Sequence, residues 1–191
     1  MQTQSHFLIT AVLAQKLPSL AQPQSRVSLL IGSILPDLPF TLLTVSYEIY
    51  YRWFGALPAD GSIMEYLHFD LFFRDPVWII SHNFFHSFVI NCVLLAIGYW
   101  GMRREQRWAG PLFWLTVGSL FHTVIDILTH HSDGPLLFFP LNWEYRFPSP
   151  ISYWESAYYG RPFRIFEYSL DALLIAYLLV AWRKQYAARL D

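Results

Sequence analysis

Charged residues and cysteine are scarce in this sequence. Lys and Arg number 13 and Asp and Glu 14, so charged residues make up 14% of the 191, against about 25% in a typical soluble domain. The formal net charge of -1 leaves no basic excess for binding nucleic acid and no acidic tail. Cys92 is the only cysteine, which excludes an internal disulfide and gives no indication of the redox compartment.

Several familiar hydrolase signatures are also missing. The sequence has no H-E-x-x-H zinc motif, no G-x-S-x-G nucleophile turn and no phosphate-binding P-loop. These absences exclude the metalloproteases, serine hydrolases and nucleotide hydrolases that depend on those motifs.

Apolar residues are abundant: hydrophobic residues make up 54% of the chain and aromatic residues 19%, and the mean hydropathy is +0.30. Four stretches reach the length of about 20 residues that a bilayer requires: 27–46, 77–100, 111–130 and 165–182. A shorter apolar stretch, 5–14, precedes them. We therefore predict an all-α integral membrane bundle of about four transmembrane helices plus a short re-entrant N-terminal helix. Residues 1–191 are expected to form one membrane-embedded domain.

Basic residues predict the orientation of this bundle. Three clusters fall on the same side of a four-span arrangement: Lys16 with Arg26, Arg103 with Arg104 and Arg107, and Arg183 with Lys184 and Arg189. Because cytoplasmic loops carry an excess of Lys and Arg, we predict a multi-pass protein of the inner (cell) membrane with both termini cytoplasmic. Loops 47–76 and 131–164 then face outward, and Arg146, Arg161 and Arg164 are exceptions in the second of them.

Ionisable side chains interrupt the apolar stretches at a regular spacing. In SLFHTVIDILTH, residues His122, Asp126 and His130 are four apart, so they share one face of a helix. The others are Asp37 after Pro36, the pairs His82/His86 and Glu167/Asp171, and His6 in the short first stretch. At about 1.5 Å per residue, five helices each place one such residue about 15–21 Å from the cytoplasmic end. These polar residues therefore converge on one layer of the membrane.

Histidine and carboxylate in this pattern indicate a metal site. Both are ligands that zinc, iron and manganese accept, and a bound cation keeps buried carboxylates ionised and imidazoles neutral. We predict divalent metal ions, more than one, with zinc expected first and manganese or iron as alternatives. The competing interpretation is a buried polar network that locks helix packing, although ionisable groups inside a membrane are functional by default.

The same residues resemble a known family. The set consists of His6, the G-x-x-x-P-D of Gly32, Pro36 and Asp37, the H…HS of His82, His86 and Ser87, and the H-x-x-x-D-x-x-x-H of His122, Asp126 and His130. It resembles the membrane-bound predicted metal-dependent hydrolases of bacteria and archaea, and is more distantly similar to the all-helical zinc-dependent phospholipase C family. The resemblance implies metal ligands at His6, Asp37, His82, His122 and Asp126, with His130 next. His86, one helical turn after His82, is also predicted to bind metal or to support a ligand. The chain departs from the family patterns at SHNFFHSF and at EYSLD, where Glu167 partly replaces an H-x-x-x-E.

Together these features predict a membrane-bound metal-dependent hydrolase that acts on a phosphoester or ester of a lipid or lipid-linked substrate. Metal ions would activate a water, and Asp37 or Glu167 would take its proton. Arg146, Arg161 and Arg164 would contact an anionic head group.

Two alternatives stay open on the sequence. One is a non-enzymatic metal-binding or metal-transporting membrane protein, although the apolar cytoplasmic halves of the last three spans disfavour a transport route. The other is a haem-binding bundle, which carboxylates at the same level fit poorly. Among the remaining polar residues, His131 and Asp133 are expected at the outer mouth and His68 on the surface of the outer loop.

Overall fold

The computed structural model describes residues 1–17, 23–56 and 62–188, and in these ranges the protein is helical without a β-strand. The long helices are α1 (Thr3–Lys16), α2 (Pro23–Gly32), α3 (Asp37–Trp53), α6 (Pro76–His86), α7 (Phe88–Arg103), α8 (Ala109–Thr129) and α9 (Gly160–Ala187). The short ones are α4 (Ile63–Glu65), the π-helix η2 (Tyr66–Leu71), α5 (Phe72–Arg74) and the 3₁₀ turn η3 (Ser156–Tyr158). The predicted all-α membrane bundle is confirmed. Arg189, part of one predicted basic cluster, lies outside the described residues.

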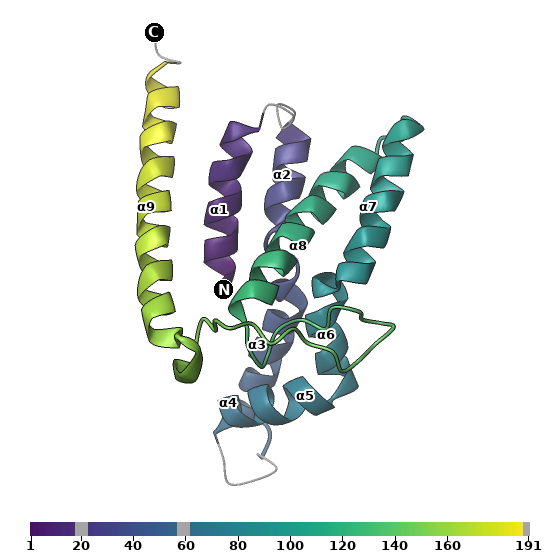
Figure 1. Cartoon of the computed structure of the whole chain (residues 1–191), viewed down its shortest axis with the longest axis vertical. Helices are drawn as coiled ribbons and strands as arrows, with labels where there is room; N and C mark the ends of the chain where they lie inside the picture. Colours follow the sequence, from purple (N-terminus) through teal and green to yellow (C-terminus); the bar gives the residue numbers. More distant parts are fainter. Residues whose placement is uncertain (18–22, 57–61, 189–191) are drawn as a thin grey trace.

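Figure 1 shows the long helices side by side, with α3 and α6 continuing α2 and α7 toward one end. The short helices α4 and α5 lie across that end, and the coil after α8 runs across the bundle beside them. The last turns of α9 lie at the opposite end, whereas the N-terminus lies part way along the bundle. The start of α1 and the end of α9 are therefore not at the same level, and which end faces the cytoplasm stays a prediction.

Two of the four predicted spans are single helices and two are bent pairs. Helices α8 and α9 are each long and apolar enough to cross a membrane. The predicted spans 27–46 and 77–100 correspond to the pairs α2 with α3, bent by 51°, and α6 with α7, bent by 46°. The described helices therefore provide two spans, or up to four if each bent pair is one span.

The bends occur at identifiable residues. Between α2 and α3, residues 33–36 form a turn that ends at Pro36, and Asp37 is the first residue of α3. Between α6 and α7, Ser87 is extended (φ -66°, ψ 125°) and its side chain accepts a hydrogen bond from the Ile90 N–H, which caps α7. His86 is the last residue of α6. Each bend therefore places an ionisable residue at a helix end in the interior of the bundle.

Close backbone contact holds α2 against α8. A Cβ on Gly118 would collide with the carbonyl oxygen of Leu29, and a Cβ on Gly32 would collide with that of Leu115. Small residues at helix contacts allow this approach in membrane bundles, where lipid gives no hydrophobic drive for association. Because the collisions are with backbone atoms, side-chain movement cannot relieve them.

Replacing Gly118 by alanine is expected to destabilise the protein by about 1–3 kcal/mol, the usual cost of overpacking. Gly110 provides a matched control on the same helix, since a Cβ there meets nothing within 4 Å. Gly110→Ala is expected to be neutral or slightly stabilising, because alanine is the better helix former. Thermal midpoints of the three detergent-purified proteins test this, and equal midpoints for both variants would contradict the packing described here.

Candidate metal centre

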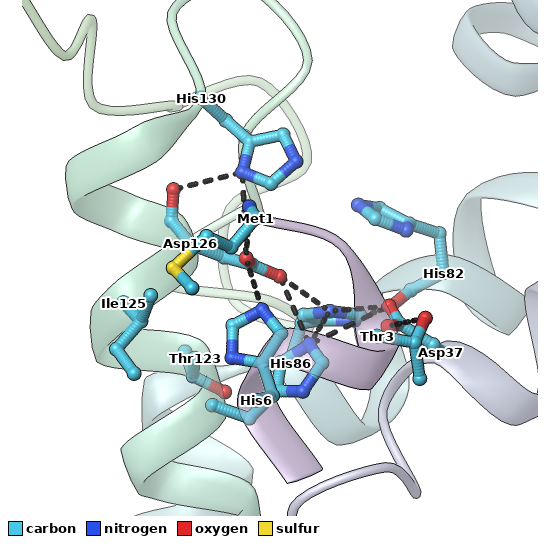
Figure 2. A network of polar contacts seen from close by, with 12 residues as sticks. Met1, Thr3, His6, Asp37, His82, His86, Thr123, Ile125, Asp126 and His130 are labelled. Atoms are coloured by element: carbon cyan, nitrogen blue, oxygen red, sulfur yellow. Dashed lines mark hydrogen bonds and ion pairs between the residues drawn. The ribbon is translucent and has the colours of Figure 1, made fainter. Parts of the chain in front are cut away.

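Four ionisable side chains from three helices meet in the interior. Asp37 comes from α3, His86 from α6, and His122 and Asp126 from α8, and one potential ligand atom of each lies within 4.8 Å of the other three. Asp126 Oδ2 lies 2.9 Å from His122 Nε2 and 3.2 Å from His86 Nε2. Asp37 Oδ1 lies 3.4 Å from each of these two nitrogens. We call these four residues the acidic-histidine cluster; Figure 2 shows the network around it.

Helix α8 supplies half of the cluster because its buried face is polar. The spacing of three or four residues along this face matches the helical repeat. Its buried residues between the middle and the end of the helix are Thr116, Gly118, Ser119, His122, Thr123, Asp126 and Thr129. The predicted single-face arrangement of His122 and Asp126 is therefore what the structure shows.

The tautomers of the two cluster histidines follow from their outer contacts. His86 Nδ1 lies 2.6 Å from the carbonyl oxygen of His82, and His122 Nδ1 lies 2.8 Å from that of Ser33. Since a carbonyl oxygen can only accept, each Nδ1 carries the proton. Ser33 is in the turn between α2 and α3, so the bend in this pair supplies the carbonyl. In the neutral rings each Nε2 then presents a lone pair.

Where the four side chains of the cluster face one another, neutral rings provide no hydrogen-bond donor. The two Nε2 atoms lie only 3.1 Å apart, and both face carboxylates, which accept but do not donate when ionised. Four converging acceptors repel each other unless a cation lies among them or the rings are protonated. Metal-bound histidines usually donate their other ring N–H to a backbone carbonyl, as both rings do here. The donor set therefore fits a divalent cation.

Two further histidines contact Asp126. His6 Nε2 lies 2.9 Å from Asp126 Oδ1, and the His6 ring stacks on that of His122 with centroids 3.7 Å apart. His130 follows the last residue of α8, and its Nδ1 lies 3.0 Å from the Asp126 carbonyl oxygen and 3.5 Å from Oδ1. The nitrogen of Met1 also lies 3.0 Å from Oδ1. The structure thus brings His6 and His130 to the cluster through Asp126.

His82 lies beside the cluster rather than in it. Its ring centroid is 4.6 Å from that of His86, and both of its nitrogens are buried without a hydrogen-bond partner. The ring packs on Phe40 and Phe72, with centroids 5.3 and 4.8 Å away. In Figure 2 the His82 ring stands on the same side of the network as Asp37, and no polar contact is drawn to the ring.

A cavity of about 950 Å³ extends from the cluster toward the short helices and the coil after α8. Asp37, His82, Asp126 and His130 line its inner part, and aromatic residues of 40–73 and 153–154 line much of the rest. Its lining residues include four carboxylates, Asp37, Glu65, Asp126 and Asp133, and no Lys or Arg in the described ranges. The cluster can therefore be reached from one side of the protein.

The predicted head-group arginines, Arg146, Arg161 and Arg164, do not line this cavity. The Arg146 guanidinium donates to the carbonyl oxygen of Gly134 and lies 5.3 Å from the Phe72 ring centroid. Arg161 and Arg164 are exposed at the start of α9. His68, expected on the surface, is half-buried and lines the cavity because η2 folds over it. His131 donates from Nδ1 to the Ser149 carbonyl, 2.7 Å away, and thereby anchors the coil.

Glu167 and Asp171 are buried on α9, but they contact α1 instead of the cluster. Glu167 Oε1 accepts a hydrogen bond from the Gln2 backbone N–H at 2.7 Å, and Asp171 Oδ2 accepts one from the Ser5 hydroxyl at 2.9 Å. The structure therefore does not bring Glu167 to the position expected of a general base.

Thr3 is a site residue that the sequence reasoning missed. Its hydroxyl donates to Asp37 Oδ2 at 2.5 Å. The sequence feature that could have identified Thr3 is its position three residues before His6, because this spacing puts both residues on one face of α1.

Asp133 gives the cavity a pH-sensitive residue outside the spans. Burial raises the pKa of its carboxyl from 3.8 to about 6, although Trp154 Nε1 donates a hydrogen bond to it at 2.9 Å. The folded state therefore binds the proton of the Asp133 carboxyl more tightly than the unfolded chain does. The stabilisation that this proton provides is complete below a pH of about 4 and is lost as the pH rises through about 6.

The variant Asp133→Asn should remove this pH dependence. Between pH values of about 4 and 7, the wild type is expected to lose on the order of 1–3 kcal/mol of stability relative to the variant. Thermal midpoints of both proteins across this range give the measurement, with Asp70→Asn as an exposed control. A constant difference between wild type and Asp133→Asn over the whole range would contradict the assignment.

The sequence profile of the YdjM inner membrane protein family matches residues 1–188. No curated protein and no solved structure gives a match.

Proposed function

The chain belongs to the YdjM inner membrane protein family, and from this premise we propose that it is a membrane-embedded metal-dependent hydrolase. The proposed reaction is hydrolysis of an ester or phosphoester in a lipid or lipid-linked substrate. The observation that carries the proposal is the convergence of four acceptors, from Asp37, His86, His122 and Asp126, within 4.8 Å of one another beside a large cavity.

The metal would be held by the acidic-histidine cluster, with His6 and His130 supporting Asp126. A bound divalent cation supplies Lewis acidity, which polarises the scissile group and lowers the pKa of a water. Asp37 is the proposed general base, since its side chain is 20% exposed and lines the cavity. The Thr3 hydroxyl orients that carboxylate by donating to Oδ2.

The shape and lining of the cavity support an amphiphilic substrate. Its volume of about 950 Å³ is at the upper end of the usual range for small-molecule sites. Phe40, Phe69, Phe72, Phe73 and Trp154 line it together with polar residues. A molecule with an apolar part against these rings and a polar part at the cluster matches this arrangement.

Transport of the metal is less well supported than hydrolysis. On the far side of the cluster from the cavity, α2 and α8 touch backbone to backbone at Gly32 and Gly118. This contact leaves no space for an ion between the two helices. Haem binding is also disfavoured, since the carboxylates of Asp37 and Asp126 lie within 3.4 Å of the Nε2 atoms of both cluster histidines and occupy the space that a macrocycle between the two rings would fill.

The test is a hydrolysis screen on detergent-purified protein supplied with zinc, manganese or iron. The panel should contain carboxylic esters, phosphomonoesters and phosphodiesters with apolar chains. We expect turnover of at least one class, and a decrease of more than about 100-fold in Asp126→Ala, which exceeds the usual effect of an outer-shell partner. A wild type that is no faster than Asp126→Ala on every substrate, with metal bound, would leave a non-enzymatic metal protein.

A further inference from the structure

Two buried carboxylates on α9 need an explanation that the cluster does not provide. Glu167 is 0% exposed and Asp171 is 7% exposed, whereas Ile165 and Leu173 on the same helix are each 70% exposed. In the described part of the chain, neither carboxylate forms an ion pair with Lys or Arg. Ionisable groups in a membrane span are costly and therefore usually have a function.

Both carboxylates contact the beginning of α1. Gln2 is the N-cap residue of α1, and its own side chain makes no capping hydrogen bond. Glu167 Oε1 instead accepts from the Gln2 backbone N–H, and Asp171 Oδ2 accepts from the Ser5 hydroxyl one turn later. A carboxylate oxygen at a helix N-terminus accepts from an N–H that has no partner within the helix. Helix α9 therefore caps α1 from outside.

A different face of α1 contacts the two acidic members of the cluster. Thr3 donates to Asp37, and His6 lies 2.9 Å from Asp126 Oδ1. Gln2 and Ser5 thus fix the side of α1 toward α9, while Thr3 and His6 act on the side toward the cluster. A shift or rotation of α1 would move both contacts at once.

We propose that Glu167 and Asp171 are positioning residues, which fix the depth and rotation of α1 so that Thr3 and His6 orient the carboxylates of Asp37 and Asp126. This inference rests on the proposed metal centre. Glu167 does not belong to the acidic-histidine cluster and does not line the cavity. Its role requires an acceptor oxygen at the Gln2 N–H and does not require a negative charge.

The variants are chosen to separate the need for an acceptor oxygen from the need for a negative charge. Glu167→Gln keeps an acceptor oxygen, and Glu167→Leu removes it at similar volume. Asp171→Asn and Asp171→Leu form the equivalent pair. Ser169→Leu is the control, since Ser169 is exposed on α9 and bonds only to the Ile165 carbonyl of its own helix.

Two quantities are measured on each purified protein: zinc affinity by competition with a chromophoric chelator, and amide hydrogen exchange over residues 3–8. Each leucine variant is expected to bind zinc about 10–100-fold more weakly, as loss of an outer-shell partner does, and to exchange faster at the start of α1. Glu167→Gln, Asp171→Asn and Ser169→Leu should stay within about threefold of the wild-type affinity, well below that effect.

The outcomes separate this inference from the proposed function. Equal losses of affinity in Glu167→Gln and Glu167→Leu would show that the charge is needed, and the positioning role would be wrong. Unchanged exchange and unchanged affinity in the leucine variants would also overturn it. If the wild type binds none of zinc, manganese and iron, the proposed metal centre fails, whereas the exchange data still show whether α9 holds α1.

Discussion

Removing divalent metal with a chelator is expected to lower the thermal midpoint of the wild-type protein by about 10 °C. A ligand at 1,000 times its dissociation constant stabilises the native state by about 4 kcal/mol, and 1 kcal/mol corresponds to about 2–4 °C for a chain of this size. The effect arises because the Nε2 atoms of His86 and His122 and the carboxylates of Asp37 and Asp126 all present lone pairs to one another. Without a cation, the repulsion among these lone pairs has to be relieved by protonation of the rings or by movement of the side chains.

The matched control for the chelator is His86→Ala/His122→Ala, which lacks two of the proposed ligands. Its midpoint should not respond to the chelator, and added zinc, manganese or iron should not raise it. Differential scanning fluorimetry in detergent measures both responses. A wild-type midpoint that stays unchanged on chelation and on metal addition would contradict the proposed centre.

The second large effect is expected for Asp126→Asn, which should weaken metal binding by more than about 100-fold, beyond the usual cost of an outer-shell change. Asp126 is the most highly connected member of the cluster. Its carboxylate oxygens lie within 3.2 Å of ring nitrogens of His6, His86 and His122. Asparagine has nearly the same shape, but it removes the negative charge that a cation needs and places an N–H₂ group toward neighbouring ring nitrogens.

A packing network would respond differently to the same substitution. Metal affinity measured by chelator competition would then be absent or unchanged in Asp126→Asn, and only the thermal midpoint would fall. Asp70→Asn is the control for loss of one negative charge, because Asp70 is exposed and paired with Arg74 across one helical turn. Equal metal affinities of Asp126→Asn and Asp70→Asn would show that Asp126 is not a ligand.

Much of the fold could be predicted from hydropathy and helical spacing. Spans 111–130 and 165–182 lie largely or wholly within α8 and α9, and the other two predicted spans are the bent pairs. The bends were not predicted, although Pro36 marks one of them. No proline marks the break at Ser87. This break depends on the hydrogen bond that the Ser87 side chain accepts from the Ile90 N–H, which forms only when the chain bends there.

The sequence predicts how deep the candidate site residues lie in the bundle, but not which neighbours their side chains contact. Counting about 1.5 Å per residue gives the depth of Asp171 in its helix, but packing sets how the helix is rotated. Depth therefore placed Asp171 level with the cluster, and the structure turns it toward Ser5 of α1. Similarly, α8 ends at Thr129, so His130 contacts Asp126 mainly through the backbone and does not continue the helix face that carries His122 and Asp126.

The most direct test of the account is the metal content of detergent-purified protein, measured by mass spectrometry for the wild type and for His122→Ala/Asp126→Ala. The account predicts near-stoichiometric zinc, manganese or iron in the wild type and its loss in the double variant. A wild type that contains no metal and takes up none when it is supplied would contradict the account. The cluster would then be a polar packing network with protonated histidines.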